Sequence, residues 1–174
     1  MNDYCFSNGD EQSGMKRITV RLKSQTLTLF LGDRVTRTYN VSTAKNGAGE
    51  LQDSECTPRG RHLIAAKIGG SYPTNSVFVG RVATGEIFRE EMKTLYPARD
   101  WILTRILWLE GLEVNLNRGA GRDSKNRYIY IHGTRDSTVL GAPGSRGCIR
   151  MRNDDVCELY EEVEIGTVVQ INDS

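Results

Sequence analysis

Residues 17–42 read RITVRLKSQTLTLFLGDRVTRTYNVS and carry the clearest fold signal in the chain. Apolar side chains occupy every second position in 18–22 and again in 27–31. Polar or glycine-containing breaks at 23–25 and 32–33 interrupt this pattern where turns are expected. A period of two is typical of strands that bury one face. The stretch therefore predicts consecutive β-strands joined by short turns.

More short strands are expected further along the chain. A turn at 57–60, with the sequence TPRG, leads into the apolar run HLIAAKI. RYIYIHGT at 127–134 and IGTVVQI at 165–171 are rich in β-branched and aromatic residues, which favour strands. Segments rich in Gly and Asn at 44–50 and 113–126 are expected to be loops.

Helical signals are fewer and shorter. The segment 86–97 predicts a short helix that stops before its final proline. Residues 101–112 fit a helical period and a period of two equally well, so both structures stay open. The segment 153–163 has apolar residues at helical spacing, with Asn153 or Asp154 as the expected N-cap.

These elements predict one mainly β domain with short helices, of the α+β class. The chain has 174 residues, of which 38% are hydrophobic and 26% charged, an ordinary composition for one globular domain. A domain of this size buries about 70% of its extended-chain surface. We expect the domain to cover residues 16–174 and the polar residues 1–15 to form a flexible N-terminal tail.

Charge and hydropathy exclude two classes of partner. The net charge is +1, and acidic and basic residues are interleaved, so no nucleic-acid partner is expected. No apolar run approaches the roughly 18 residues that a membrane span needs, so no membrane partner is expected either. The N-terminus lacks the pattern of a secretory signal, which predicts a cytoplasmic location, or a periplasmic one if an export signal has been removed.

The cysteines predict free thiols rather than a metal centre. The chain has four, Cys5, Cys56, Cys148 and Cys157, with no C-x-x-C pair and only two histidines. A structural zinc site is therefore not expected. Cys5 and Cys56 carry no recognisable signal.

One of these thiols has the surroundings of a nucleophile. Cys148 lies in GAPGSRGCIRM, and His132 ends a predicted strand sixteen positions upstream. A free thiol has a pKa near ~8.5 and an imidazole near ~6.5, so the pair suffices for acyl transfer. The N–H of Gly147 is a candidate oxyanion donor, and the carbonyl of Gly133 a candidate partner that orients His132.

Other readings compete with this one. The chain could be a catalytically idle peptide-binding module, or a thiol redox sensor that pairs Cys148 with Cys157. For Cys157 a core-facing position on the predicted helix is the simpler expectation. His62 is expected to be structural or on the surface. Trp101 and Trp108 are expected in the core rather than as platforms for sugars.

The motifs around both residues resemble the signature of the L,D-transpeptidase catalytic domain family, of the YkuD and ErfK type. TPRG resembles an upstream turn of that family, and the likeness covers roughly residues 16–172. The matching positions are Ile131, His132, Gly133, Thr134, Ser145, Arg146, Gly147, Cys148, Ile149 and Arg150.

The resemblance implies a β-sandwich-like core of mixed sheets, with a short helix after the cysteine. It implies that Cys148 attacks the bond between the third residue and the terminal D-Ala of a peptidoglycan stem tetrapeptide or muropeptide. D-Ala then leaves with a proton from His132, and a thioester forms. The resemblance implies that no metal or other cofactor is needed. An amine from a second stem gives a 3→3 cross-link, a wall protein can be the acceptor instead, and water gives a tripeptide.

The resemblance also suggests residues that contact the substrate. Arg146 departs from the commonest pattern, which has a second histidine there, and its fixed charge could favour the thiolate or bind a carboxylate. Arg150 could equally anchor its loop or read a substrate carboxylate. The full set of candidates is Ser145, Arg146, Arg150, Tyr130 and Arg105.

Hydrolysis is favoured over cross-linking as the main outcome. Cross-linking takes place outside the cytoplasm, and no export signal is recognised in this sequence. The expected role is therefore that of an L,D-carboxypeptidase that trims tetrapeptides during recycling of the wall, with L,D-transpeptidase activity as the alternative.

Overall fold

The computed structural model describes residues 14–174, so the predicted tail lies outside the described residues except for its last two positions. This part of the chain forms ten strands and two helices. In chain order they are β1 (Lys16–Arg21), β2 (Thr26–Leu31), β3 (Arg34–Asn40), β4 (Gly60–Ile68), β5 (Ser76–Val79), β6 (Val82–Ile87), α1 (Glu90–Leu95), β7 (Ile102–Gly111), β8 (Tyr130–Gly133), β9 (Ile149–Met151), α2 (Asn153–Glu162) and β10 (Val168–Asn172).

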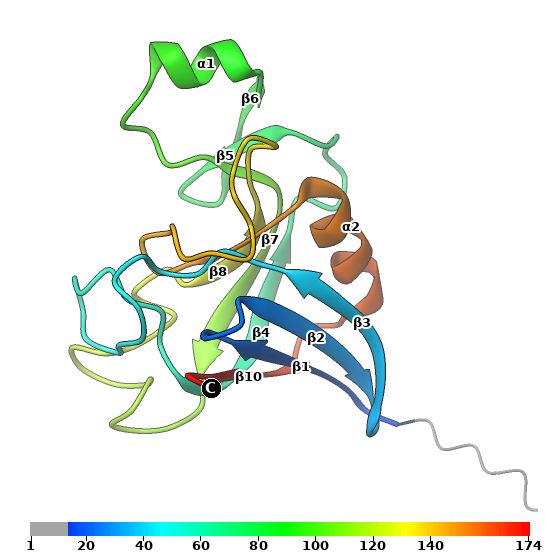
Figure 1. Ribbon diagram of the computed structural model, residues 1–174, viewed down its shortest axis with the longest axis vertical. Coiled ribbons are helices and arrows are strands. Elements are labelled where there is room, and N and C mark those ends of the chain that lie inside the picture. Colours follow the sequence, from blue (N-terminus) through cyan, green and yellow to red (C-terminus); the bar gives the residue numbers. More distant parts are fainter. Residues whose placement is uncertain (1–13) are drawn as a thin grey trace, which may run out of the picture.

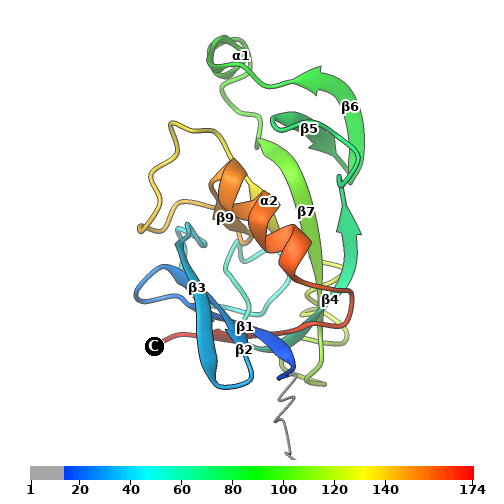
Figure 2. The ribbon, with the colours of Figure 1, turned by 90° about the vertical axis from the view of Figure 1, so that its right-hand side faces the viewer.

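The strands form one mixed sheet, ordered β3-β2-β1-β10-β4-β7-β5-β6. A short branch leaves β7, where β8 pairs with β7 and β9 pairs with β8. The pairs β1–β10 and β8–β9 are parallel, and the others are antiparallel. Figures 1 and 2 show the strongly curved sheet with α2 packed over β7 and β8. The predicted fold class, mainly β with short helices and mixed pairing, is confirmed.

The alternating stretch at 17–42 folds as predicted, into β1, β2 and β3 with turns at both breaks. Ile18, Val20, Leu27 and Leu29 lie in the main core, with at most 1% of their surface exposed. The alternating apolar residues therefore form the face of these strands that packs in the core. β1 then pairs in parallel with β10.

The ambiguous segment 101–112 is a strand, β7, rather than a helix. Its two faces bury apolar residues in different places, because Leu107 and Leu109 belong to the main core while Ile106 joins a second cluster. Trp101 is in a buried core cluster as predicted, with its ring 4.8 Å from that of Phe88.

The two predicted helices are present, but the expected N-cap of the second is wrong. The cap of α2 is Arg152, and neither Asn153 nor Asp154 caps it. Asn153 is the first helical residue, and its side chain is occupied elsewhere. It accepts a hydrogen bond from Thr104 Oγ1 at 2.6 Å and donates to the carbonyl of Thr134 at 2.9 Å.

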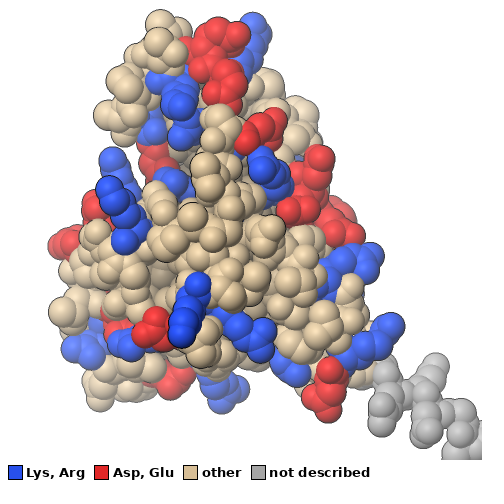
Figure 3. Space-filling model, viewed as in Figure 1, with Lys and Arg blue, Asp and Glu red and all other residues tan. Residues whose placement is uncertain are grey.

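The segment that contains β5, β6 and α1 projects from one end of the molecule (Figures 1 and 2). We call residues 76–95 the projection. α1 buries none of its residues. The projection is held by the pairing of β5 with β7, by Phe78, and by a small cluster of Val77, Phe88, Trp101 and Leu103. The surface drawn in Figure 3 mixes acidic and basic side chains. Among residues 14–174 no helix has the length and apolarity that a membrane crossing requires.

Candidate active site

Strands β8 and β9 bring His132 and Cys148 to one face of the sheet. Their parallel register places Ile131 opposite Ile149 and His132 opposite Arg150. Both isoleucines are fully buried in the main core. Because successive side chains of a strand point to opposite faces, His132 and Arg150 point away from that core. Cys148 directly precedes β9 and continues the same alternation, so its thiol lies on the face of His132.

His132 is a fully buried, neutral imidazole in this structure. Its Nδ1 lies 2.7 Å from the carbonyl oxygen of Gly133, the orienting partner that the sequence suggested. A carbonyl only accepts hydrogen bonds, so Nδ1 carries the proton and Nε2 carries a lone pair. Burial lowers the pKa of His132. Nε2 has no hydrogen-bond partner among the described residues.

Cys148 is half-buried, and its thiol contacts the backbone of residues 128–130. Its Sγ lies 3.3 Å from the carbonyl oxygen of Tyr128, to which it donates, and 3.4 Å from the amide nitrogen of Tyr130. Burial raises the pKa of Cys148 to about 12, so the resting group is a thiol. The thiol and the imidazole of His132 share a face but not a hydrogen bond.

The turn before Cys148 accepts only glycine at Gly147. Its φ of +127° is a conformation that L-residues rarely adopt, and an added Cβ would lie 3.2 Å from the carbonyl oxygen of Cys56. The N–H of Gly147 donates to Ser145 Oγ at 3.2 Å. Ser145 Oγ in turn donates to the carbonyl of Cys148. Ser145 is thus buried within the turn rather than presented to a substrate, and the amide of Gly147 is already engaged.

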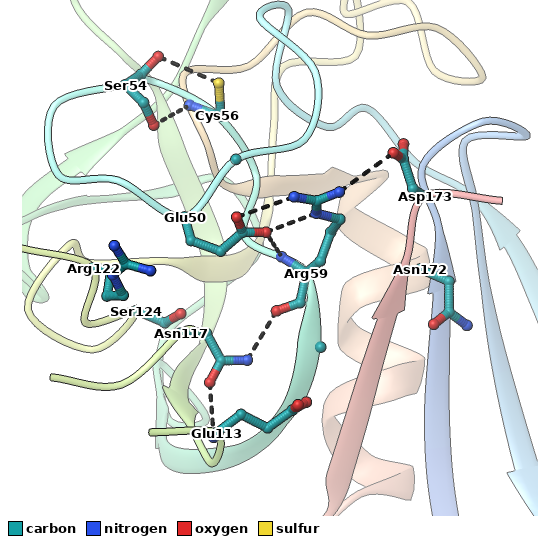
Figure 4. Close-up of polar contacts among 12 residues, drawn as sticks. Glu50, Ser54, Cys56, Arg59, Glu113, Asn117, Arg122, Ser124, Asn172 and Asp173 are labelled. Carbon is teal, nitrogen blue, oxygen red and sulfur yellow. Dashed lines mark hydrogen bonds and ion pairs between the residues drawn. The ribbon is translucent and has the colours of Figure 1, made fainter. Parts of the chain in front are cut away.

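The TPRG turn at 57–60 is hydrogen-bonded to the loop that carries Cys148. Thr57 Oγ1 accepts a hydrogen bond from the amide of Ala44 and donates to the carbonyl of Gly147 at 2.9 Å. Arg59 of the same turn pairs with Glu50, at 2.7 Å, and approaches Asp173, at 3.8 Å (Figure 4). The TPRG motif therefore stabilises the loop that carries Cys148.

His62 is structural, as predicted. It is fully buried, with Nδ1 3.1 Å from the carbonyl oxygen of Gly60 and Nε2 2.8 Å from Ser124 Oγ. Burial lowers the pKa of His62 to about 4, so the ring is neutral. Asn117 completes this buried polar cluster by donating to the carbonyl of Arg59 (Figure 4).

Arg150 anchors its own loop, which is one of the two roles left open by the sequence. Its Nη2 lies 2.8 Å from Asp100 Oδ1, and its Nη1 donates to the carbonyl of Gly144 at 3.0 Å. Burial by itself would raise the pKa of Asp100, but the imidazole of His132, once protonated at acidic pH, and the guanidinium of Arg150 lower it overall. Sequence analysis missed Asp100, because fifty positions separate it from Arg150 and no motif marks it.

Arg146 and Arg105 take different positions. Arg146 is exposed and lines a cavity of about 150 Å³ near the site. Arg105 is not brought to the site: its guanidinium lies 5.5 Å from the ring centre of Tyr160 on α2. It also donates to the carbonyl of Tyr72 at 2.9 Å. The alternation of β7 explains this, since the neighbouring Ile106 faces the site and Arg105 faces the other side.

An aromatic wall lies beside the thiol, and Tyr130 is part of it. Phe78, Ile106 and Tyr130 form a buried cluster against which Cys148 and Trp108 pack. Trp108, expected in the core, is only half-buried. The wall also holds an arginine that sequence analysis missed: Arg81 Nη1 donates to the hydroxyl of Tyr130 at 3.0 Å.

The cysteines of residues 14–174 form no disulfide. Cys56, Cys148 and Cys157 are all free, and Cys157 is half-buried on α2 rather than fully in the core. Cys5 lies outside the described residues.

The fold is similar to that of solved L,D-transpeptidase domains. The solved L,D-transpeptidase (residues 123–326) of Xylanimonas cellulosilytica DSM 15894 aligns with a TM-score of 0.54 at 19% identity, over 92% of this chain and 61% of that one. The structure of Bd1075 of Bdellovibrio bacteriovorus aligns with a TM-score of 0.57 at 17% identity, over 95% and 50% of the two chains.

The sequence assigns the family. The model of the YkuD family, the L,D-transpeptidase catalytic domain, matches residues 15–171, and this chain belongs to that family. The putative L,D-transpeptidase YqjB of Bacillus subtilis is 26% identical over 159 residues, which cover 90% of this chain and 70% of YqjB. The probable L,D-transpeptidase ErfK/SrfK of Salmonella typhimurium is 49% identical over 47 residues, only 27% of this chain and 15% of that protein. The aligned parts thus cover less than two thirds of ErfK/SrfK and of both solved chains.

Proposed function

We propose that this protein is a cysteine-dependent acyl-transfer enzyme that cleaves the terminal D-Ala from peptidoglycan stem tetrapeptides. The observation that carries the proposal is the free lone pair of His132 Nε2, buried without a partner among the described residues, on the same face as the thiol of Cys148. The names of relatives in the family, putative or probable L,D-transpeptidases, support the choice of substrate.

The reaction begins with a proton transfer within the pair. Rotation of the Cys148 side chain away from the carbonyl of Tyr128 turns the sulfur toward His132, and Nε2 takes the thiol proton. The sulfur then attacks the carbonyl carbon of the third residue, and the C–N bond to D-Ala breaks. His132 returns its proton to the leaving amine, and a thioester remains on Cys148.

The proposed reaction gives the histidine the task of activating the thiol. A thiol with a pKa of about 12 is almost entirely protonated at neutral pH, so it is a poor nucleophile alone. The neutral tautomer of His132, fixed by Gly133, is the form that accepts a proton. The amide of Gly147 can serve as the oxyanion donor once the substrate oxygen replaces Ser145 Oγ as its acceptor.

Hydrolysis of the thioester is the favoured second half of the reaction. Arg146 is exposed next to the nucleophile and has no ion-pair partner among residues 14–174. An acceptor amine arrives as an ammonium ion at neutral pH, and a fixed positive charge opposes its approach, whereas water is unaffected. The product is then a tripeptide, and the protein acts as an L,D-carboxypeptidase.

We place this activity in the cytoplasm, where it would trim tetrapeptides that return from the wall. Three described cysteines are free thiols, which suits a reducing compartment.

Mass spectrometry of a purified tetrapeptide incubated with the enzyme tests the function. We expect loss of D-Ala, a tripeptide as the main product and no reaction with the Cys148→Ala variant. A dimer as the main product would overturn the preference for hydrolysis. Continued release of D-Ala by Cys148→Ala would overturn the nucleophile.

A further inference from the structure

Arg81 is a half-buried cation that packs on the aromatic side chains next to the candidate nucleophile. It has no acidic partner among the described residues. Its guanidinium lies 4.3 Å from the ring centre of Trp108 and 5.1 Å from that of Tyr128. Its Nη1 donates to the hydroxyl of Tyr130. No carboxylate among residues 14–174 forms a salt bridge with it. Arg99, which also stacks on an aromatic ring, does have such a partner in Glu86.

The backbone holds Arg81 in an unusual conformation. It follows Gly80 in the tight turn between β5 and β6, and both residues have positive φ values, 54° and 67°. Gly and Asn are the usual residues at such a turn position, and a long side chain there is disfavoured. The turn nevertheless directs the arginine onto the aromatic wall. A residue held in such a conformation often has a functional role.

The aromatic rings fix the guanidinium plane but leave its charge unbalanced. Cation–π contact and one hydrogen bond to a hydroxyl leave most of the five N–H donors of an arginine free for a ligand. A planar guanidinium binds carboxylates with two parallel hydrogen bonds. The chemistry of the position therefore fits a carboxylate of the bound peptide.

The length of Tyr130 indicates which carboxylate. The amide of Tyr130 contacts Cys148 Sγ, and its hydroxyl contacts Arg81, so one whole tyrosine side chain separates thiol and guanidinium. The carboxylate of the leaving D-Ala is separated from the scissile carbonyl carbon by only a nitrogen and one carbon. A carboxylate at the end of the side chain of the third residue is several carbons further away, as the spacing requires.

We propose that Arg81 binds a carboxylate at the end of the side chain of the third stem residue. The protein would then prefer stems with a diamino dicarboxylic acid, such as diaminopimelate, over stems with lysine. This inference rests on the proposed function, because it assumes that Cys148 receives the acyl group of a stem peptide.

Steady-state kinetics on two tetrapeptides that differ only in the third residue test it. We expect the wild type to release D-Ala from the diaminopimelate peptide with at least about tenfold higher kcat/KM than from the lysine peptide, through KM. Arg81→Gln should lose this preference and leave the lysine peptide unchanged, and Arg81→Lys should retain part of it. Arg17→Gln is the matched control, because Arg17 stacks 4.0 Å over Phe30 on β1 and β2, far from the thiol.

Each other outcome counts against the proposal. An unchanged preference in Arg81→Gln would overturn it. An equal rise in KM for both peptides would assign Arg81 to the carboxylate of D-Ala instead. If the wild type cleaves neither peptide, the proposed function fails, and calorimetric binding of both peptides to Cys148→Ala, with and without Arg81→Gln, then decides the role of Arg81 alone.

Discussion

The strand that carries His132 and the projection that carries Arg81 are held in opposite ways. All four residues of β8 are buried, between β7 on one side and β9 on the other. α1, in the projection, buries no residue at all. The groups proposed for bond breaking are thus fixed by packing, whereas Arg81, proposed for substrate choice, lies in the turn between the buried strand β5 and the strand β6, which buries none of its residues.

This difference predicts different dynamics. Segments with few buried contacts open locally at low free-energy cost, while core strands open only with the whole fold. Asp100 lies between the projection and β7 and contacts Arg150 on β9, so this ion pair links the segment that follows the projection to the nucleophile loop. The comparison leads to predictions about both sides and about this link.

The largest effect on activity is expected at β8, the strand that is fixed by packing. His132→Gln should lower kcat by about 10²–10⁴-fold, because the proton acceptor is lost. The thermal unfolding temperature of the variant should change little, since glutamine can keep a polar contact with Gly133. A variant that retained more than a tenth of the wild-type kcat would remove His132 from the proposed chemistry.

Gly147→Ala should disturb the packing of the fixed side. An alanine at a φ of +127° is strained by about 1–3 kcal/mol, and its Cβ would crowd the carbonyl of Cys56. We expect a lower free energy of unfolding in urea and strongly reduced activity. Gly141→Ala is a useful control, because it also has positive φ but an added Cβ would meet nothing within 4 Å. Equal loss of activity in both variants would show that strain alone, rather than the contact, matters.

Much of the fixed side could be predicted from the sequence, because its signals are local. The period of two in 17–42 gave three strands, and His132 next to Gly133 placed the ring and its carbonyl partner in adjacent residues. The period of β7 was ambiguous, because a strand that is buried on both faces has apolar residues at nearly every position.

The linking and projecting parts could not be predicted in the same way. Asp100 and Arg150 meet only through the tertiary fold, and nothing in either local sequence marks the pair. Asn153 fits a helix cap by residue type, yet long-range bonds to Thr104 and Thr134 decide its role. The sequence around Arg81 predicts only a surface residue in a turn. Its contacts with Trp108 and Tyr130 form only in the folded structure.

Breaking the link tests whether the two parts cooperate. Asp100→Asn should lower kcat/KM about fivefold, which corresponds to about 1 kcal/mol for a partly exposed ion pair. The negative charge of Asp100 raises the pKa of His132, although burial lowers it overall. Without that charge the pKa of His132 falls further, so the acidic limb of the pH–rate profile should move to lower pH. A limb that stays in place, or moves up, would show that Asp100 acts only on the loop.

A smaller change is expected from the exposed charge at the site. Arg146→His replaces a permanent cation with a ring that is mostly neutral at pH 8, and should raise the ratio of dimer to tripeptide about twofold to fivefold. The ratio is measured by mass spectrometry with tetrapeptide as donor and acceptor. The same experiment on Arg152→His controls for a general change of charge, because Arg152 is an arginine that donates to the backbone carbonyl of Asp136. A ratio that stays constant would assign the choice between water and amine to another group.

The smallest effect should come from the outer surface of the projection. Leu95 is 71% exposed on α1, so Leu95→Ala should change the free energy of unfolding by less than about 0.5 kcal/mol. Leu103→Ala, at a fully buried position in the cluster below it, should cost about 2–5 kcal/mol. Chemical denaturation of both variants measures the contrast. If Leu95→Ala destabilised the protein as much as Leu103→Ala, α1 would have to be packed against something in solution, and the projection would not be the weakly held part of the site.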